Sequence, residues 1–296
     1  MIRIVEVGPR DGLQNEPLPI STAHKLQFIK DLEAAGLREI EVSSFVSPKW
    51  VPQLGDATEL FRDLGEQSAK FYALVPNLKG LERAIEAGVK HIALFTAASS
   101  EFTRANINMS VDESLVQFKA VSDEFRSRVP EGTVRGYVST AFDCPYSGRV
   151  NSSEVVRVVT NLTEEIGVDE ISLGDTIGVA VPKDVETLHR ALAGSTDVSR
   201  IAWHFHDTRG TALANVAKSL ELGYTIFDAS AGGLGGCPYA KGAGGNLATE
   251  DLVYFLERTG VSSGVDLKRL AQASLPIFAA LGRAPTAKAQ VAVLAG

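Results

Sequence analysis

The chain has 296 residues, of which 45% are hydrophobic and 22% are charged, and its formal net charge is −7. This length is typical of a single α/β barrel, and the composition suffices for a large buried core. The acidic balance argues against nonspecific binding to nucleic acid or to an anionic membrane surface.

A repeated sequence pattern predicts that helices and strands alternate along the chain. An apolar helix end, a glycine and then a β-rich run occur in this order around Gly36, Gly88, Gly167 and Gly223. Glycine just beyond a helix supplies the left-handed residue that turns the chain back. With four further β-rich runs, the pattern predicts eight strands, over residues 2–7, 39–43, 71–75, 91–95, 134–139, 170–173, 200–205 and 225–229.

Capping signals predict where helices begin between these strands. Ser21 precedes one amphipathic helix, Ser110 and Glu113 form a capping-box pattern before another, and Asn151 precedes a third. Eight strands alternating with helices predict a (β/α)₈ TIM barrel, with a doubly wound open sheet as the alternative. We expect one domain over residues 1–296, with one further helix from about residue 262 packed on the barrel.

The seventh predicted strand ends in a pair of histidines. His204 and His206 are two residues apart, so in a strand their imidazoles point the same way. Two polar groups satisfied inside the barrel would be the simpler explanation. However, two of the five histidines of the chain share this one strand face. This favours a divalent cation held at the strand end.

Other predicted strands carry polar residues at the same end, where barrel enzymes place their chemistry. The first strand leads into Arg10, Asp11 and Gln14, although a simple loop ion pair would also explain an Arg-Asp dipeptide. The second strand contains Glu41, a carboxylate that needs a partner such as Arg10 if it is buried. The sixth strand ends at Asp175. We expect Glu41 and Asp175 to support neighbouring groups.

A glycine-rich segment follows the eighth predicted strand. Seven of the 16 residues from 231 to 246 are glycine, which predicts a loop built for close backbone approach. Cys237 in this loop could exchange a proton with a carbanion. Asn246 is either the N-cap of the last barrel helix or an oxygen ligand beside Asp11 and the two histidines. Two oxygen and two nitrogen donors are typical of Mg²⁺ or Mn²⁺, with Zn²⁺ as the alternative.

Five segments form specific motifs: EVGPRDGLQNE at 6–16, FVSPKWVPQ at 45–53, EISLGDTIG at 170–178, the segment 204–215 and GLGGCPYAKGAGGNLATEDLVY at 233–254. These motifs resemble those of the hydroxymethylglutaryl-CoA lyases of the DRE-TIM metallolyase superfamily. The resemblance runs from the first strand to the terminal helix. It implies a metal-assisted retro-Claisen cleavage of 3-hydroxy-3-methylglutaryl-CoA, or of a close 3-hydroxy-3-alkylglutaryl-CoA. The products would be acetyl-CoA and acetoacetate or the corresponding 3-oxo acid, as in leucine degradation and ketone body formation.

The resemblance also implies roles for individual residues. The metal ligands would be Asp11, His204, His206 and Asn246. Arg10 would stabilise the enolate oxygen, Asp11 would accept the hydroxyl proton, and Cys237 would protonate the enolate carbon. The catalytic set would also include Glu41, and the substrate-binding set would comprise Arg10, Gln14, Asp175 and Gly236. Arg209 stands where the family commonly has tyrosine, which leaves the alkyl substituent of the substrate open.

Two other functions are compatible with parts of this pattern. A Claisen-condensing acyl-CoA and 2-oxo acid synthase shares the barrel, but the Gly-Gly-Cys-Pro-Tyr-Ala loop distinguishes the lyase from such relatives. A non-catalytic acyl-CoA-binding barrel would have no use for a proton donor. The expected partner is an acyl-CoA thioester, with neither nucleic acid nor membrane, in a homo-oligomer such as a dimer or tetramer.

Compartment follows from cysteine content and from the start of the sequence. Cys144 and Cys237 are too few for a disulfide framework and suit a reducing compartment. No signal or transit segment precedes the first apolar run, and no apolar stretch is long enough to span a bilayer. We therefore expect a cytoplasmic protein.

Overall fold

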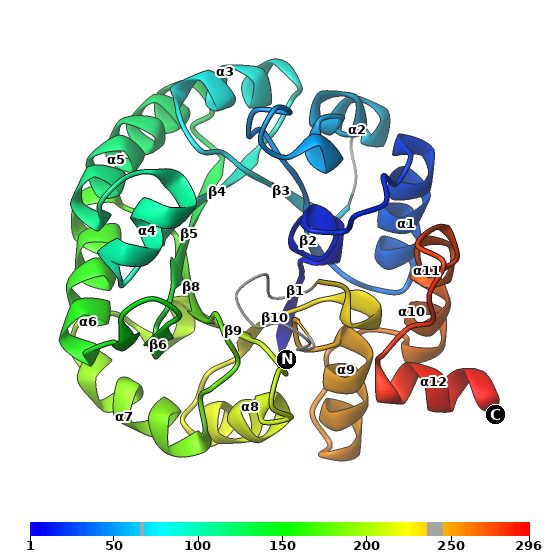
Figure 1. The fold of residues 1–296 in the computed structure, drawn as a ribbon. Coiled ribbons are helices and arrows are strands. Elements are labelled where there is room, and N and C mark those ends of the chain that lie inside the picture. The colour runs from blue at the N-terminus through cyan, green and yellow to red at the C-terminus, as the bar shows by residue number, and fades with distance from the viewer. Residues whose placement is uncertain (66–67, 236–244) are drawn as a thin grey trace.

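Eight parallel strands hydrogen-bond into one closed ring in the computed structural model, which describes residues 1–65, 68–235 and 245–296 (Figure 1). In order around the ring they are β1 (Arg3–Glu6), β10 (Ile226–Ala229), β9 (Ile201–Phe205), β8 (Glu170–Asp175), β5 (Thr133–Ser139), β4 (His91–Ala97), β3 (Lys70–Leu74) and β2 (Glu39–Ser44). All eight predicted strands are confirmed, with ends that differ by at most two residues. The ring confirms the predicted barrel, and the open-sheet alternative is wrong.

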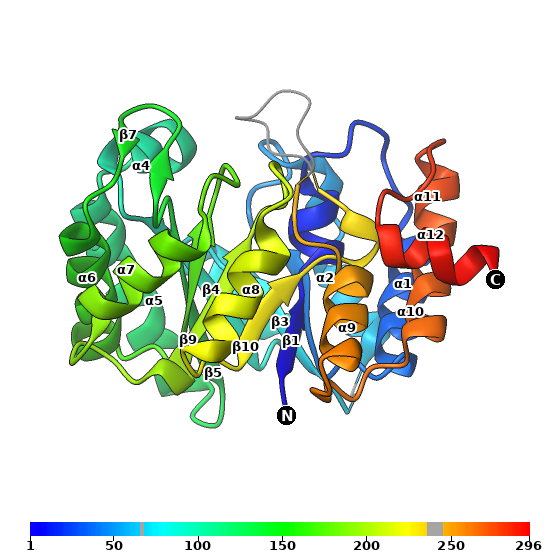
Figure 2. The same ribbon diagram turned by 90° about the horizontal axis from the view of Figure 1, so that it is seen from below.

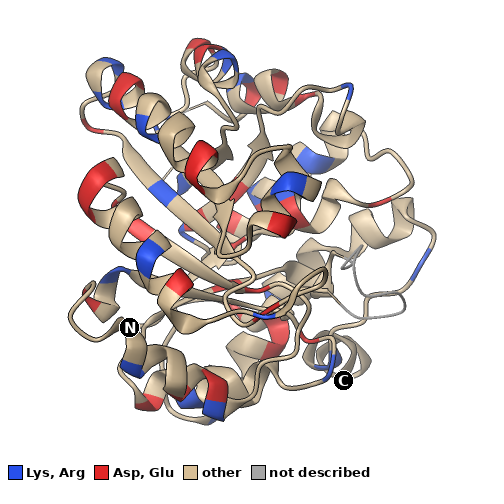
Figure 3. Cartoon of the chain, turned by 60° about the vertical axis from the view of Figure 1, so that its left-hand side comes forward, with Lys and Arg blue, Asp and Glu red and all other residues tan. Residues whose placement is uncertain are grey.

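Helices surround this ring on its outer face (Figure 1). In the described part of the chain they are α1 (Thr22–Ala34), α2 (Ala57–Leu64), α3 (Leu78–Glu86), α5 (Val111–Arg128), α6 (Ser152–Thr160), α7 (Pro182–Leu192), α8 (Ala212–Glu221) and α9 (Thr249–Arg258). Helix α4 (Ser100–Ile107) lies instead over one mouth of the barrel (Figure 2). The predicted caps are confirmed, because Ser21, Ser110 and Asn151 each accept a backbone hydrogen bond at the start of their helix. Acidic and basic residues are mixed along these outer helices (Figure 3).

The C-terminal region differs from its prediction. One helix was expected over this segment, but the structure has α10 (Leu267–Ala273), α11 (Leu275–Ala280) and α12 (Lys288–Ala295). Pro276 sits in the first turn of α11 and has no N–H to continue the hydrogen bonding of α10, so the helix restarts at Ser274. Helices α10 and α11 pack on α1, and α12 packs on α9 and α10. We therefore propose that residues 1–296 form a single domain.

The closure of the ring brings distant parts of the sequence together. Strand β1 pairs with β10, so the segment that follows β1 lies beside the segment that follows β10. The segments that follow the strands gather at one mouth of the barrel with α4 and the hairpin of β6 (Asp143–Cys144) and β7 (Gly148–Arg149), while the amino terminus lies at the other mouth (Figure 2). None of the helices in the described residues has the length and apolar character needed to cross a bilayer.

The buried carboxyl group of Glu250 predicts a pH-dependent stability. Glu250 lies in the first turn of α9, and its side chain accepts a hydrogen bond from Gly232 N at 2.7 Å. Burial outweighs this bond and raises the pKa of Glu250 to about 8 from an ordinary value of 4.5. Between these values the unfolded chain has lost the proton while the folded protein keeps it. The free energy of unfolding therefore falls as the pH rises.

We expect Glu250→Gln to remove this dependence, since a carboxamide does not titrate. Relative to the variant, the wild-type free energy of unfolding should fall by up to about 1.4 kcal/mol per pH unit between pH 5 and 8. Urea titrations at several pH values measure it. Glu257→Gln, at an exposed position of the same helix, is the matched control. Parallel curves for wild type and Glu250→Gln would contradict the prediction.

Candidate metal centre and active site

Three side chains from distant parts of the sequence converge at the mouth of the barrel. Asp11 lies in η1 (Gly8–Gly12), a short π-helical turn directly after β1, His204 lies in β9, and His206 follows it. Each offers one possible ligand atom, and these atoms all lie within 4.8 Å of one another. His204 Nε2 is 3.3 Å from His206 Nε2 and 3.9 Å from Asp11 Oδ2. The predicted convergence of the two imidazoles with Asp11 is thus present.

Asn246 completes this group. It forms a β-bridge with His206, and its Nδ2 donates hydrogen bonds to Asp11 Oδ2 at 2.8 Å and to Leu234 O at 3.2 Å. Its Oδ1 is buried and has no hydrogen-bond partner in the described structure. Because an unsatisfied buried oxygen is costly, a cation is a fitting partner for it. The alternative of Asn246 as a helix N-cap is wrong, because the N-cap of α9 is Ala248.

The protonation states of His206 and Asp11 suit metal binding. Burial, together with the neighbouring His204, lowers the pKa of His206 to about 4. Burial alone would raise the pKa of Asp11, but Arg10 and His204 outweigh it and lower this pKa to about 2. At neutral pH the site therefore offers a neutral imidazole and an ionised carboxylate. These are the forms in which both side chains bind cations.

Arg10 is held rigidly beside the three converging side chains. It is 5% exposed, its Nε donates to Glu41 Oε2 at 2.7 Å, and its Nη1 donates to Asp11 Oδ1 at 2.8 Å. The predicted pairing of Arg10 with Glu41 is therefore confirmed. Tyr137 adds a third contact, because its hydroxyl donates to Glu41 Oε2 at 3.0 Å and the Arg10 guanidinium lies 5.4 Å from its ring centroid. The buried carboxylate of Glu41 thus fixes the orientation of the Arg10 guanidinium.

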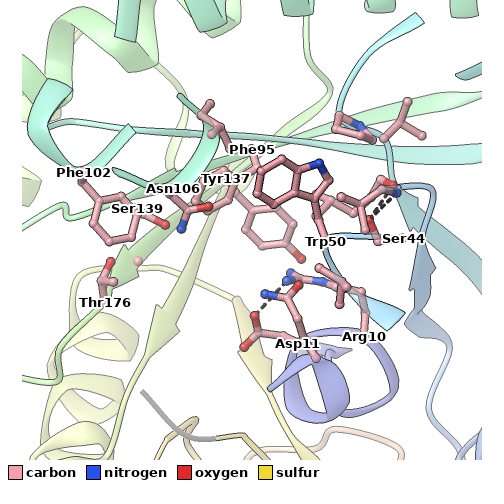
Figure 4. A pocket seen from close by; sticks show the side chains of 18 of the residues that line it. Arg10, Asp11, Ser44, Trp50, Phe95, Phe102, Asn106, Tyr137, Ser139 and Thr176 are labelled. Atoms are coloured by element: carbon pink, nitrogen blue, oxygen red, sulfur yellow. Dashed lines mark hydrogen bonds and ion pairs between the residues drawn. The ribbon is translucent and has the colours of Figure 1, made fainter. Parts of the chain in front are cut away.

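A cavity of about 970 Å³ opens from these residues toward the solvent (Figure 4). Its lining includes Arg10, Asp11 and the two histidines together with aromatic and amide side chains. The sequence reasoning assigned no role to several residues that line it: Trp50, Phe95, Phe102, Asn106, Tyr137 and Thr176. Two of them could have been predicted, because Trp50 lies within the FVSPKWVPQ motif and Tyr137 lies on the inward face of β5. The volume is typical of a site for a small molecule or cofactor.

The other predicted site residues have mixed outcomes. Gln14 lines the cavity. Asp175 is absent from the described cavity lining, and its two carboxylate oxygens accept hydrogen bonds from Val179 N and Ala180 N, both at 3.0 Å. Asp175 thus holds the turn after β8, because a strand-end carboxylate readily captures the free N–H groups of the next turn. Its role in substrate binding stays a prediction. Gly236 and Cys237 lie outside the described residues.

Comparison with known proteins bears on this site. The profile of the HMGL-like family matches residues 1–277. The chain is 48% identical to a Pseudomonas aeruginosa protein named 3-hydroxy-3-isohexenylglutaryl-CoA/hydroxymethylglutaryl-CoA lyase, over 99% of this chain and 97% of that protein. The crystal structure of hydroxymethylglutaryl-CoA lyase from Pseudomonas aeruginosa superposes with a TM-score of 0.95 at 48% identity, covering 99% of this chain and 97% of that one.

A second solved structure adds ligands to the comparison. It is an HMG-CoA lyase from Acinetobacter baumannii in complex with coenzyme A and 3-methylmalate. It superposes with a TM-score of 0.91 at 37% identity and covers 97% of this chain and 93% of that one. The resemblance seen in the sequence motifs is therefore confirmed over nearly the whole length, and the chain belongs to the HMGL-like family.

Proposed function

We propose that this protein is a carbon–carbon lyase that cleaves 3-hydroxy-3-methylglutaryl-CoA, or a close 3-alkyl analogue, to acetyl-CoA and a 3-oxo acid. One observation carries the proposal: a cluster of metal-ligand type and a buried guanidinium line the same cavity. Membership of the HMGL-like family and the names of the similar lyases support it.

Asp11, His204, His206 and Asn246 are our candidates for the metal ligands. The set has two oxygen and two nitrogen donors, which favours Mg²⁺ or Mn²⁺ over Zn²⁺. The buried Asn246 Oδ1, which has no hydrogen-bond partner among the described residues, is the observation that best fits a bound cation. When bound, a divalent cation lowers the pKa of a coordinated hydroxyl, so that even a weakly basic carboxylate can accept its proton.

Two side chains would act on the substrate directly: one accepts the hydroxyl proton and the other stabilises the negative charge of the enolate. Asp11 is our candidate for accepting the proton of the tertiary hydroxyl, after which the C2–C3 bond breaks and its electron pair passes to the thioester enolate. Arg10 would stabilise the negative charge on the enolate oxygen. Its fixed position between Asp11 and Glu41 supports this role, because a preorganised donor needs no reorientation during the reaction.

The remaining assignments rest on the sequence and on the cavity lining. Glu41 and Gln14 are proposed to orient Arg10 and the substrate. Cys237 is proposed to protonate C2 of the enolate, and Gly236 to contact the substrate. The complex of the Acinetobacter lyase with coenzyme A supports an acyl-CoA thioester as the ligand of the cavity. A cytoplasmic location and a homo-oligomeric state stay predictions from the sequence.

The apolar side chains of the cavity bear on the alkyl substituent. Phe95, Phe102 and Val138 line it on the side of β4, α4 and β5. A methyl group alone would leave part of such a lining uncovered, whereas a longer branched chain would bury more of it. The name of the Pseudomonas relative includes an isohexenyl substrate, which supports a longer substituent here as well.

A metal-dependent cleavage assay tests the proposed function. The protein is first treated with EDTA and then given 3-hydroxy-3-methylglutaryl-CoA and a series of longer 3-alkyl esters. We expect no acetyl-CoA without added metal and stoichiometric acetyl-CoA and 3-oxo acid after Mg²⁺ or Mn²⁺ is restored. A parallel incubation with acetyl-CoA and 2-oxo acids tests condensation through the release of free thiol. Thiol release without ester cleavage would replace the lyase with the condensing synthase, and inactivity in both assays would leave the non-catalytic acyl-CoA-binding barrel.

A further inference from the structure

The buried guanidinium of Arg135 inside the barrel contacts two side chains next to the candidate site, Tyr137 and Asp228. Arg135 lies in β5, is 1% exposed, and donates from Nη1 to Tyr137 Oη at 2.8 Å. Its Nη1 and Nη2 also pair with the two oxygens of Asp228, at 3.0 and 2.5 Å. A bidentate pair of this kind fixes the plane of the carboxylate as well as its distance. The position of Asp228 is thus set by Arg135.

Asp228 in turn contacts a proposed metal ligand. Strand β10 pairs with β9 so that Asp228 lies opposite His204, and Asp228 Oδ2 is 3.1 Å from His204 Nδ1. A carboxylate on this nitrogen holds the proton at Nδ1, which leaves the Nε2 lone pair free. Nε2 is the atom that faces Asp11 and His206. Asp228 is therefore placed to select the tautomer and the orientation of His204.

Two other side chains hold Asp228 in place. Arg135 donates to both of its carboxylate oxygens, and Ser172 Oγ donates a hydrogen bond to Asp228 Oδ2 at 2.7 Å. These contacts fix the carboxylate beside His204 Nδ1, where it is placed to accept the imidazole hydrogen.

We infer that Arg135 and Asp228 are positioning residues of the lyase, which hold His204 in the tautomer and orientation that bind the cation. The inference rests on the proposed function, because it takes His204 as a metal ligand. Neither residue is among the described residues that line the cavity, so both act through His204 and not on the substrate. Loss of such an outer partner typically weakens metal binding by about 10-fold to 100-fold.

The variant Asp228→Asn tests this inference, with Glu170→Gln as its matched control. Glu170 Oε1 accepts from Arg135 Nε at 2.7 Å, so both variants exchange a buried carboxylate of the same guanidinium for a carboxamide. Of these two carboxylates, Asp228 contacts His204, whereas Glu170 pairs with Arg3 and Arg135. The Kd for Mn²⁺ is measured by isothermal titration calorimetry in the absence of substrate. We expect an increase of about 10-fold or more for Asp228→Asn and of no more than about twofold for Glu170→Gln.

Arg135→Lys provides a second variant, because it keeps the positive charge and loses the bidentate geometry. Its Kd for Mn²⁺ should rise by about threefold to tenfold. If Asp228→Asn does not fold, the Kd of Arg135→Lys alone tests the inference. Saturating Mn²⁺ should restore most of the kcat of either variant, which a general loss of barrel structure would not allow. Folded Asp228→Asn with wild-type affinity, Arg135→Lys with wild-type affinity, or equal weakening in Glu170→Gln would overturn the inference. Failure of the wild type to cleave the ester would instead refute the proposed function.

Discussion

Arg10→Gln should lower kcat for thioester cleavage by about 100-fold to 1,000-fold, the loss expected when one preorganised donor to a developing oxyanion is removed. This corresponds to about 3 kcal/mol of transition-state stabilisation. The side chain is suited to this role because Glu41 and Asp11 already fix it in the wall of the cavity. Its contribution should exist mainly in the transition state, where the negative charge develops. KM should therefore change far less than kcat.

The matched control for this variant is Arg3→Gln. Arg3 begins the same strand, β1, and pairs with Glu39 and Glu170 at the opposite mouth of the barrel. It should leave kcat near the wild-type value, whatever it does to thermal stability. Steady-state kinetics and Mn²⁺ titration of both variants separate the roles, because Arg10 donates hydrogen bonds and is not a ligand type for cations. A wild-type kcat in folded Arg10→Gln would contradict the assigned role.

The fold was largely predictable because its signals are local. Glycine at Gly36, Gly88, Gly167 and Gly223 has a positive φ in the structure, as the turn from helix to strand requires. The capping box at Ser110 and Glu113 is also formed from residues only three positions apart. Helices α10 and α11 were predicted as one because their apolar periodicity continues through Pro276. The missing N–H of this proline interrupts the helix all the same.

The site was predictable only in part, for the opposite reason. His204 and His206 are neighbours in sequence, so the strand period alone places them together. The links from Arg135 to Asp228 and from Tyr137 to Glu41 join residues 93 and 96 positions apart. They depend on the register of a closed ring, which no local pattern gives. The orientation of Asp175 was not predictable either. A carboxylate at a strand end can face the cavity or the next turn, and the backbone N–H groups of that turn decide between the two.

The second large effect is expected for His206→Ala. His206 is half-buried, and its buried Nδ1 has no hydrogen-bond partner in the described structure. Its described polar contact is the one between its Nε2 and His204. Removing a ligand itself should cost more than removing an outer partner, so the Kd for Mn²⁺ should rise by more than about 100-fold. Activity at a fixed, subsaturating Mn²⁺ concentration should fall in the same proportion.

Calorimetry and a metal titration of the cleavage rate measure this effect together, with His24→Ala as the control at an exposed position. The low pKa of His206 keeps the ring neutral at pH 7, so its loss should not change the charge of the site. The expected defect is therefore one of metal occupancy, and raising Mn²⁺ should recover part of the rate. If His206→Ala bound Mn²⁺ as tightly as His24→Ala does, the ligand set proposed here would be wrong, and with it the retro-Claisen assignment that depends on a cation beside Arg10.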